Sequence, residues 1–179
     1  MRTAAKQLMR AAILASLAVG LAACQTTPYR RTLPEWVQRV HVPMVVNETT
    51  EPGLEERFTD AVTRELLADG RLDVVAKSQA DAVLRVTVRS YKTRTATFGS
   101  DDVEMNRQVD LLLVLALYDP SDPKTPFARA KAFDIPFRYY SDFRGLAALT
   151  ESDASDRLSS VVGRAVVQRL MTGMEMTQP

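Results

Sequence analysis

Hydrophobic and polar residues between positions 40 and 91 follow two different periods, which predict a strand, a helix and further strands in that order. Residues 40–46 alternate with a period of two, which is typical of a half-buried strand. From residue 54 the apolar positions recur every three or four residues, and this spacing predicts an amphipathic helix with one buried stripe: Leu54, Phe58, Ala61, Val62 and Leu66. Gly70 stands where a left-handed helix cap is expected.

Further strands and a second helix complete the predicted fold. A short apolar run covers residues 72–76, and longer strands are predicted at residues 82–91, 105–118 and 127–137. A second amphipathic helix begins at Thr150 and ends by Gly173. This order predicts an α+β two-layer sandwich, with a mostly antiparallel sheet of about four to five strands and two helices packed on one face.

The N-terminus has the three parts of a bacterial secretory signal, namely a basic start, an apolar middle and small residues before Cys24. Leu21-Ala22-Ala23-Cys24 resembles a lipobox, which implies cleavage before Cys24 and acylation of its sulfur; the alternative is an ordinary signal followed by an incidental cysteine. We therefore expect four regions: a cleaved signal peptide (1–23), the lipidated cysteine and a tether (24–36), one α+β domain (37–173) and a disordered C-terminus (174–179). Gln25 favours sorting to the outer membrane, on its periplasmic face.

The sequence offers little for catalysis. His41 is the only histidine, and Cys24, the only cysteine, is expected to carry lipid. The chain has no glycine-rich phosphate loop, no paired zinc-ligand spacing and no nucleophile elbow. The formal net charge of +1 gives no reason to expect nucleic acid as a partner. We expect a protein that is not an enzyme, with no catalytic residue, metal or cofactor.

One face of the predicted sheet combines cations with apolar residues. If Ala82, Leu84, Val86 and Val88 face the helices, then Tyr91 and Phe133 lie on the opposite face together with four basic residues: Arg85, Arg89, Arg129 and Lys131. The strand between them contains LLLVLAL, which is apolar on both faces and needs cover from arginine stems, a protein partner or acyl chains. Such a face suits an amphipathic anion, although solvated cations beside a central strand would look the same. Residues expected to contact a partner are Leu111, Leu113, Leu115, Tyr139, Tyr140 and Phe143.

Several short segments resemble the lipopolysaccharide-assembly lipoprotein family, LptE. They are Pro43–Val46, Asn47-Glu48-Thr49, Glu51-Pro52-Gly53-Leu54-Glu55, Asp69-Gly70-Arg71 and Ala80-Asp81-Ala82-Val83-Leu84, in this order and spacing. The resemblance implies an outer-membrane lipoprotein that plugs a large β-barrel translocon, LptD, and assists lipopolysaccharide assembly at the outer leaflet. It also implies that basic residues bind lipopolysaccharide, but no motif assigns their positions, so the choice of the four cations above rests on the face that they share.

Two other classes of lipoprotein share the strand–helix–strand beginning. One comprises secretion components and regulators of the curli-secretion and penicillin-binding-protein-activator type, which need only one compact patch for their partner. The other comprises auxiliary lipoproteins of phospholipid transporters, which would bind acyl lipid without a barrel partner. The long strand that is apolar on both faces, together with the basic face, favours the lipopolysaccharide interpretation.

Overall fold

The computed structural model describes residues 32–98, 104–140 and 151–177. The predicted signal peptide, Cys24 and Phe143 lie outside these ranges. Two α-helices, α2 (Leu54–Asp69) and α3 (Glu151–Thr172), and one short 3-10 helix, η1 (Lys77–Gln79), accompany the sheet. The strands are β1 (Arg39–His41), β2 (Val46–Asn47), β3 (Asp73–Val74), β4 (Ala82–Phe98), β5 (Glu104–Tyr118), β6 (Pro126–Ala130), β7 (Phe133–Tyr140) and β8 (Met174–Met176).

The strands form one eight-stranded mixed sheet in the order β3-β1-β4-β5-β6-β8, with β2 added to β4 and β7 added to β5. The prediction of four to five mostly antiparallel strands is therefore wrong in size, and it missed the parallel pairs of β1 with β3 and β4 and of β2 with β4. These pairs are parallel because α2 carries the chain back along the sheet before β3 and β4 begin. The predicted strand at 40–46 is split into β1 and β2 by residues 42–45, which include Pro43.

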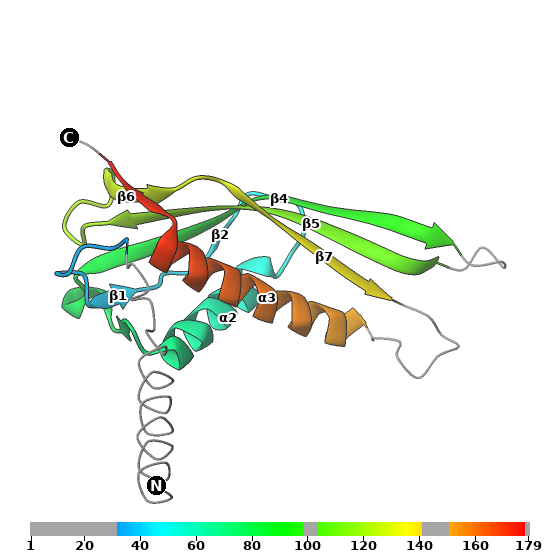
Figure 1. Cartoon of the computed structure of the whole chain (residues 1–179), viewed down its shortest axis with the longest axis horizontal. Coiled ribbons are helices and arrows are strands. Elements are labelled where there is room, and N and C mark those ends of the chain that lie inside the picture. The colour runs from blue at the N-terminus through cyan, green and yellow to red at the C-terminus, as the bar shows by residue number, and fades with distance from the viewer. Residues whose placement is uncertain (1–31, 99–103, 141–150, 178–179) are drawn as a thin grey trace, which may run out of the picture. The chain divides into compact units, whose positions relative to one another are not determined.

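Both helices pack on the same face of the sheet, as predicted (Figure 1). The buried residues of α2 are those of the predicted stripe. Gly53 and Gly70 flank α2 with φ values of 76° and 68°, a conformation that glycine adopts without strain, and the Gly70 N–H donates to the Leu66 carbonyl at 3.1 Å. The helices and the facing strands share one hydrophobic core, and among the described residues no helix covers the opposite face of the sheet.

Two interruptions of the strand alternation, a bulge and a break, place aromatic residues on the helix side of the sheet. A bulge between Val88 and Ser90 shifts the register of β4, so Tyr91 pairs with the buried Leu111 and lies on the helix side. The predicted strand at 127–137 is broken between β6 and β7, so Phe133 pairs with Leu113 and is buried. The prediction that Tyr91 and Phe133 lie on the opposite face is wrong for this reason.

Both ends of the described domain belong to the fold. The backbone N–H and the hydroxyl of Thr32 each donate to the Met171 carbonyl at 3.0 Å, and Leu33 is buried in the core. Residues 32–36 are therefore part of the domain, not of a tether. The prediction of disorder is also wrong for residues 174–176, because they form β8 and pair with Ala128–Ala130 of β6. Hydrogen bonds to neighbouring segments order both stretches.

Asp81 joins the starts of β1 and β4. Its Oδ2 accepts the backbone N–H groups of Gln38 at 3.2 Å and Arg39 at 2.8 Å, and its Oδ1 accepts Nη2 of Arg39 at 2.7 Å. These hydrogen bonds lower the pKa of Asp81 to about 2. The bond from the Arg39 side chain has the largest effect, and the bond from the Arg39 backbone has the next largest. The folded state therefore favours the ionised carboxylate.

Replacing Asp81 with asparagine is expected to lower the melting temperature at neutral pH. A lowered carboxyl pKa stabilises the folded state above the unfolded pKa, and this stabilisation is lost as the pH falls from about 4 towards about 2. The difference in melting temperature between the wild type and Asp81→Asn should thus be smaller at pH 3 than at pH 6, as measured by circular dichroism. Asp60→Asn, at an exposed position of α2, is the control and should leave the melting temperature unchanged at both values. A difference that is independent of pH would contradict the assigned ion pair.

Candidate functional site

The open face of the sheet is the face turned away from α2 and α3, and its middle is apolar. Leu112, Val114 and Ala116 of β5 point to this side, because the odd-numbered residues of the same strand fill the core beneath the helices. Leu112 and Val114 are half-buried although no described helix covers them. The prediction that LLLVLAL is apolar on both faces is confirmed, and the apolar strip on the open side consists of these three residues.

Two of the predicted cations lie on either side of this strip. Arg85 of β4 and Arg129 of β6 are both paired in register with Ala116, so their Cα atoms are two strand spacings, or about 10 Å, apart. The Arg85 guanidinium lies over the ring of Tyr118, 4.2 Å from its centroid. Arg129 is exposed and has no ion pair with any residue in the described ranges. An anionic group above the strip could contact both guanidinium groups.

The other two predicted cations are separate from this pair and are already neutralised. Arg89 stands at the bulge of β4 and forms an ion pair with Glu48 at 2.6 Å. Lys131 follows the end of β6 and forms an ion pair with Glu175 at 3.3 Å. The structure therefore brings together Arg85 and Arg129, but not all four residues. Exposed ion pairs of this kind contribute little to stability, so both side chains could still exchange partners.

Sequence reasoning missed a second basic group farther along the open face. After the bulge, the open side of β4 carries Lys92 and Arg94, which pair in register with Asp110 and Gln108. Arg94 forms an ion pair with Asp110 at 3.3 Å, and Arg138 of β7 donates to Gln108 at 3.0 Å. Asp134 and Arg138, four residues apart in β7, were the available signal, because polar residues at even positions indicate which side of that strand faces outward.

A small hollow lies beside Arg85 at the end of the open face where β4 begins. It has a volume of about 150 Å³, and its polar lining includes His41, Lys77, Arg85 and Tyr118. Nδ1 of His41 lies 3.2 Å from the Val75 carbonyl oxygen. Because a carbonyl oxygen can only accept, Nδ1 carries the hydrogen and donates this bond. This bond orients the ring. The position of His41 on the side away from the helices agrees with the prediction from alternation, since it pairs with Val83.

The residues predicted to contact a partner are mostly not at the surface. Leu111, Leu113 and Leu115 are 0% exposed and pack beneath the helices. This part of the prediction is wrong because these residues lie on the buried side of β5 and not on its open side. Tyr139 is also buried, and its hydroxyl lies 3.4 Å from Nη1 of Arg107. The side chain of Tyr140 and the whole of Phe143 fall outside the described part of the chain. On the surface, Leu112 and Val114 take the place of the predicted leucines.

The described residues contain neither a cluster of metal ligands nor a helix that could span a membrane. In residues 32–98, 104–140 and 151–177, no group of three histidine, cysteine, aspartate or glutamate side chains is placed to hold a metal ion. No helix within the same ranges is long and apolar enough to cross a membrane.

Comparisons with known proteins identify a family. The model of the family described as LptE, lipopolysaccharide-assembly, matches residues 37–174. None of the curated proteins matches the sequence. Among solved structures, protein XCC0632 from Xanthomonas campestris is 12% identical, with a TM-score of 0.51 and coverage of 78% of this chain and 86% of that one, and it shares the fold.

Two lipoprotein structures are also similar. The rare lipoprotein B from Shewanella oneidensis is 14% identical, with a TM-score of 0.41 and coverage of 74% of this chain and 90% of that chain. The minor lipoprotein from Acinetobacter baumannii is 11% identical, with a TM-score of 0.45 and coverage of 82% and 100%. The family match alone takes in most of the sequence, including both helices and the strands from β1 to β7. The chain therefore belongs to the LptE family of lipopolysaccharide-assembly proteins.

Proposed function

We propose that this protein is an outer-membrane lipoprotein, anchored on the periplasmic side through acylated Cys24, that supports a β-barrel translocon of the LptD type during lipopolysaccharide assembly. Membership of the LptE family carries the proposal. The lipobox-like sequence before Cys24 supports the anchor, since the two acyl chains of a diacylated cysteine hold a domain at a membrane without a spanning helix.

We further propose that the open face is the surface that meets lipopolysaccharide. Its apolar strip, Leu112, Val114 and Ala116, suits acyl chains, while Arg85 and Arg129 on either side suit the anionic groups at the head of the same molecule. Arginine is well adapted to this task because its planar guanidinium donates two parallel hydrogen bonds to a phosphate or carboxylate. Lys92, Arg94 and Arg138 extend the basic surface beyond the strip.

The regulator and the phospholipid-transporter alternatives each predict a different partner. A regulator of a periplasmic synthase would bind that enzyme, and a transporter subunit would bind an inner-membrane complex. Neither class requires a half-buried apolar strip between two arginines on the side of the sheet that the helices leave uncovered. This arrangement favours the lipopolysaccharide proposal.

Affinity purification from gently solubilised outer membranes tests the proposed partner. The tagged, lipidated chain is expected to retain one large β-barrel protein in a fixed ratio, and a tagged lipoprotein of another fold is the control. Mass spectrometry of the N-terminal peptide should show a mature chain that begins at an acylated Cys24. Recovery of a peptidoglycan synthase or an inner-membrane transporter in place of the barrel would overturn the proposed function.

A further inference from the structure

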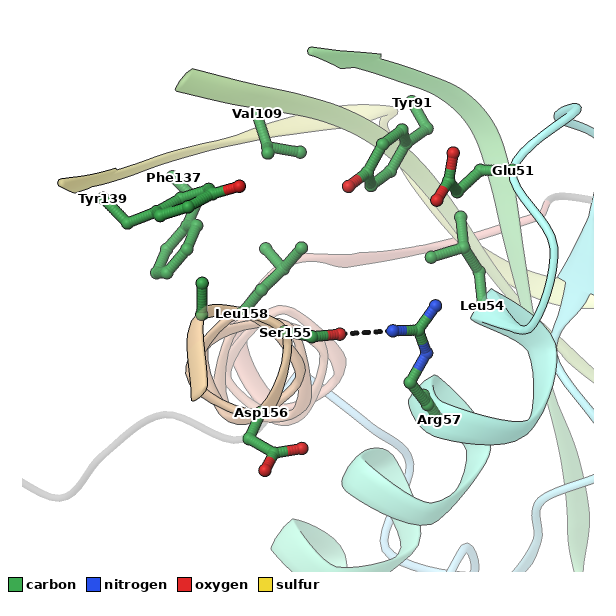
Figure 2. A pocket seen from close by; sticks show the side chains of 11 residues that line it. Glu51, Leu54, Arg57, Tyr91, Val109, Phe137, Tyr139, Ser155, Asp156 and Leu158 are labelled. Carbon is green, nitrogen blue, oxygen red and sulfur yellow. Dashed lines mark hydrogen bonds between the residues drawn. The ribbon is translucent and has the colours of Figure 1, made fainter. Parts of the chain in front are cut away.

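A second cavity lies on the helix side of the sheet, between the two layers (Figure 2). Its volume is about 310 Å³, at the lower end of the range for small-ligand sites. The sheet contributes Tyr91, Val109, Phe137 and Tyr139, and the helices contribute residues from the first turns of α2 and α3. It is separated from the open face by the sheet itself, so the two sites are independent surfaces of the protein.

The interlayer space is left open here for identifiable reasons. The bulge after Val88 turns Tyr91 towards the helices, where its ring forms part of the wall. Ala154 and Ser155 of α3 are small, and they face this space where larger residues would fill it. The cavity is therefore produced by the positions of particular side chains at the ends of both helices.

One side of the cavity is apolar, polar side chains line the rest, and one oriented cation lies among them. Figure 2 shows Val109, Phe137 and Leu158 on the walls and the Arg57 guanidinium extending from α2 towards Ser155. Arg57 donates to the Gly53 carbonyl at 3.0 Å, to the Pro52 carbonyl at 3.3 Å and to the Ser155 hydroxyl. All three acceptors are neutral, so these bonds hold the guanidinium in place without cancelling its charge.

Two carboxylates and the Tyr91 hydroxyl are the other polar groups that decide which head group fits beside Arg57. The Asp156 side chain is directed away from the cavity (Figure 2), which leaves Glu51 as the lining carboxylate nearest to Tyr91. Burial is the largest cause that raises the pKa of Tyr91, so its hydroxyl stays protonated at neutral pH and can donate a hydrogen bond. A carboxylate or phosphate could accept from this hydroxyl and from Arg57 together.

We propose that this cavity binds one acyl chain of an anionic amphiphile, with the chain between Val109, Phe137 and Leu158 and the head group at Arg57. The volume is suited to a single chain, and displacing water from the apolar side of the cavity is favourable. The site is additional to the proposed contact between the open face and lipopolysaccharide, and it does not depend on that contact.

Photo-cross-linking tests this proposal on the lipidated protein in phospholipid nanodiscs. The probe is dodecanoate with a diazirine near its terminal carbon, and mass spectrometry identifies the labelled peptides. Fragmentation of the labelled peptides locates each label to a residue: labels are expected on Val109, Phe137 or Leu158, and unlabelled dodecanoate should compete. Labels on Leu112 or Val114 of the open face in place of these residues would overturn the proposal.

Variants that fill the cavity from opposite walls give the second test. Ala154→Leu in α3 and Val109→Phe in β5 should each reduce specific labelling at least about tenfold, because the added side chains occupy the space of the acyl chain. Ala165→Leu, on the same helix but away from the cavity, is the control and should retain labelling. Circular dichroism confirms that each variant is folded, and undiminished labelling in either folded cavity variant would overturn the site.

The head group is tested through Arg57. Arg57→Gln should weaken competition by dodecanoate about tenfold, which corresponds to the loss of one charge-assisted hydrogen bond, and should leave competition by dodecanol unchanged. Stronger competition by dodecylamine than by dodecanoate would assign the head-group contact to Glu51 and overturn the proposed charge preference.

The source of the acyl chain is distinguished by two forms of the probe. One is the free acid added to the nanodiscs, and the other is the same chain esterified in phosphatidylglycerol within them. Labelling of the cavity by the free acid alone identifies a fatty acid, while labelling by both forms identifies one chain of a membrane lipid; either supports the proposal. Labelling by neither form overturns it, and it does so without bearing on the barrel partner or on the open face.

Discussion

Replacing Gly163 with alanine is expected to destabilise the protein, although alanine is ordinarily the better residue inside a helix. Gly163 lies in α3 where this helix contacts α2, and a Cβ at that position would be 2.7 Å from the Ala61 carbonyl oxygen and 3.1 Å from its carbon. Both atoms belong to the backbone of α2, so they cannot move aside as a flexible side chain would. The two helices must separate, and the core beneath them must loosen.

The expected loss is about 1–3 kcal/mol of unfolding free energy, or roughly 3–10 °C in melting temperature, because overpacking outweighs the gain of up to about 1 kcal/mol in helix propensity. Chemical denaturation and calorimetry would measure both quantities. Ser160→Ala, at an exposed position one turn earlier, is the control and should change stability by less than about 0.5 kcal/mol. An increase in stability for Gly163→Ala would show that the helices are farther apart than the structure places them.

The sequence predicted the individual elements better than the sheet that they form. The stripe of α2 and the Gly70 cap follow from local periodicity, which depends only on residues a few positions apart. Sheet order and direction depend on pairing between distant segments, and β1, β2 and β3 are only two or three residues long. Such short segments carry too few alternating positions to show that they pair in parallel with one another or with β4.

Faces of the sheet were predicted correctly up to the first break in each strand. Arg85 was placed on the open face because Ala82 to Val88 alternate without interruption, whereas the bulge inverted the phase for Tyr91. In the next hairpin the buried positions are even in β6, at 128 and 130, and odd in β7, at 133, 135 and 139. This change of parity was visible in the sequence and indicates a break, but Ala132 preserves the even pattern long enough to hide it.

The face of the sheet on which Arg129 lies was predicted correctly by simple alternation, but the same argument does not extend to Lys131. Arg129 lies on β6 before the break, so simple alternation with Ala128 and Ala130 holds there. Lys131 follows the strand, where alternation no longer determines the direction of a side chain, and it meets Glu175 of a strand that no periodicity predicted. For Arg85 and Arg129 the structure therefore agrees with the predicted face of the sheet, and their role in binding stays a prediction.

Reversing both charges, with Arg85→Glu and Arg129→Glu, is expected to reduce lipopolysaccharide binding by about 100-fold. A hydrogen bond to a charged group contributes about 1.5 kcal/mol or more, which is about tenfold in affinity for each arginine, and the new carboxylates would also repel the anionic head group. Capture of biotinylated lipopolysaccharide by the purified, lipidated protein in a mild detergent would measure the change. Wild-type binding should also weaken as salt rises, since ions screen exposed charges beyond about 8 Å at 0.15 M.

The matched control is Arg64→Glu with Arg157→Glu, which changes the net charge equally at exposed positions of α2 and α3. It should leave binding within about twofold of the wild type, because its charges lie on the helix side of the sheet and are screened from the open face. Arg85→Glu also removes the contact with the Tyr118 ring, so both double variants need the same melting temperature within a few degrees. Equal losses in the two double variants would mean that lipopolysaccharide responds only to net charge, and unchanged binding in the first would remove the open face as its site. Either result would leave membership of the family intact, because that rests on the sequence match and not on these two arginines.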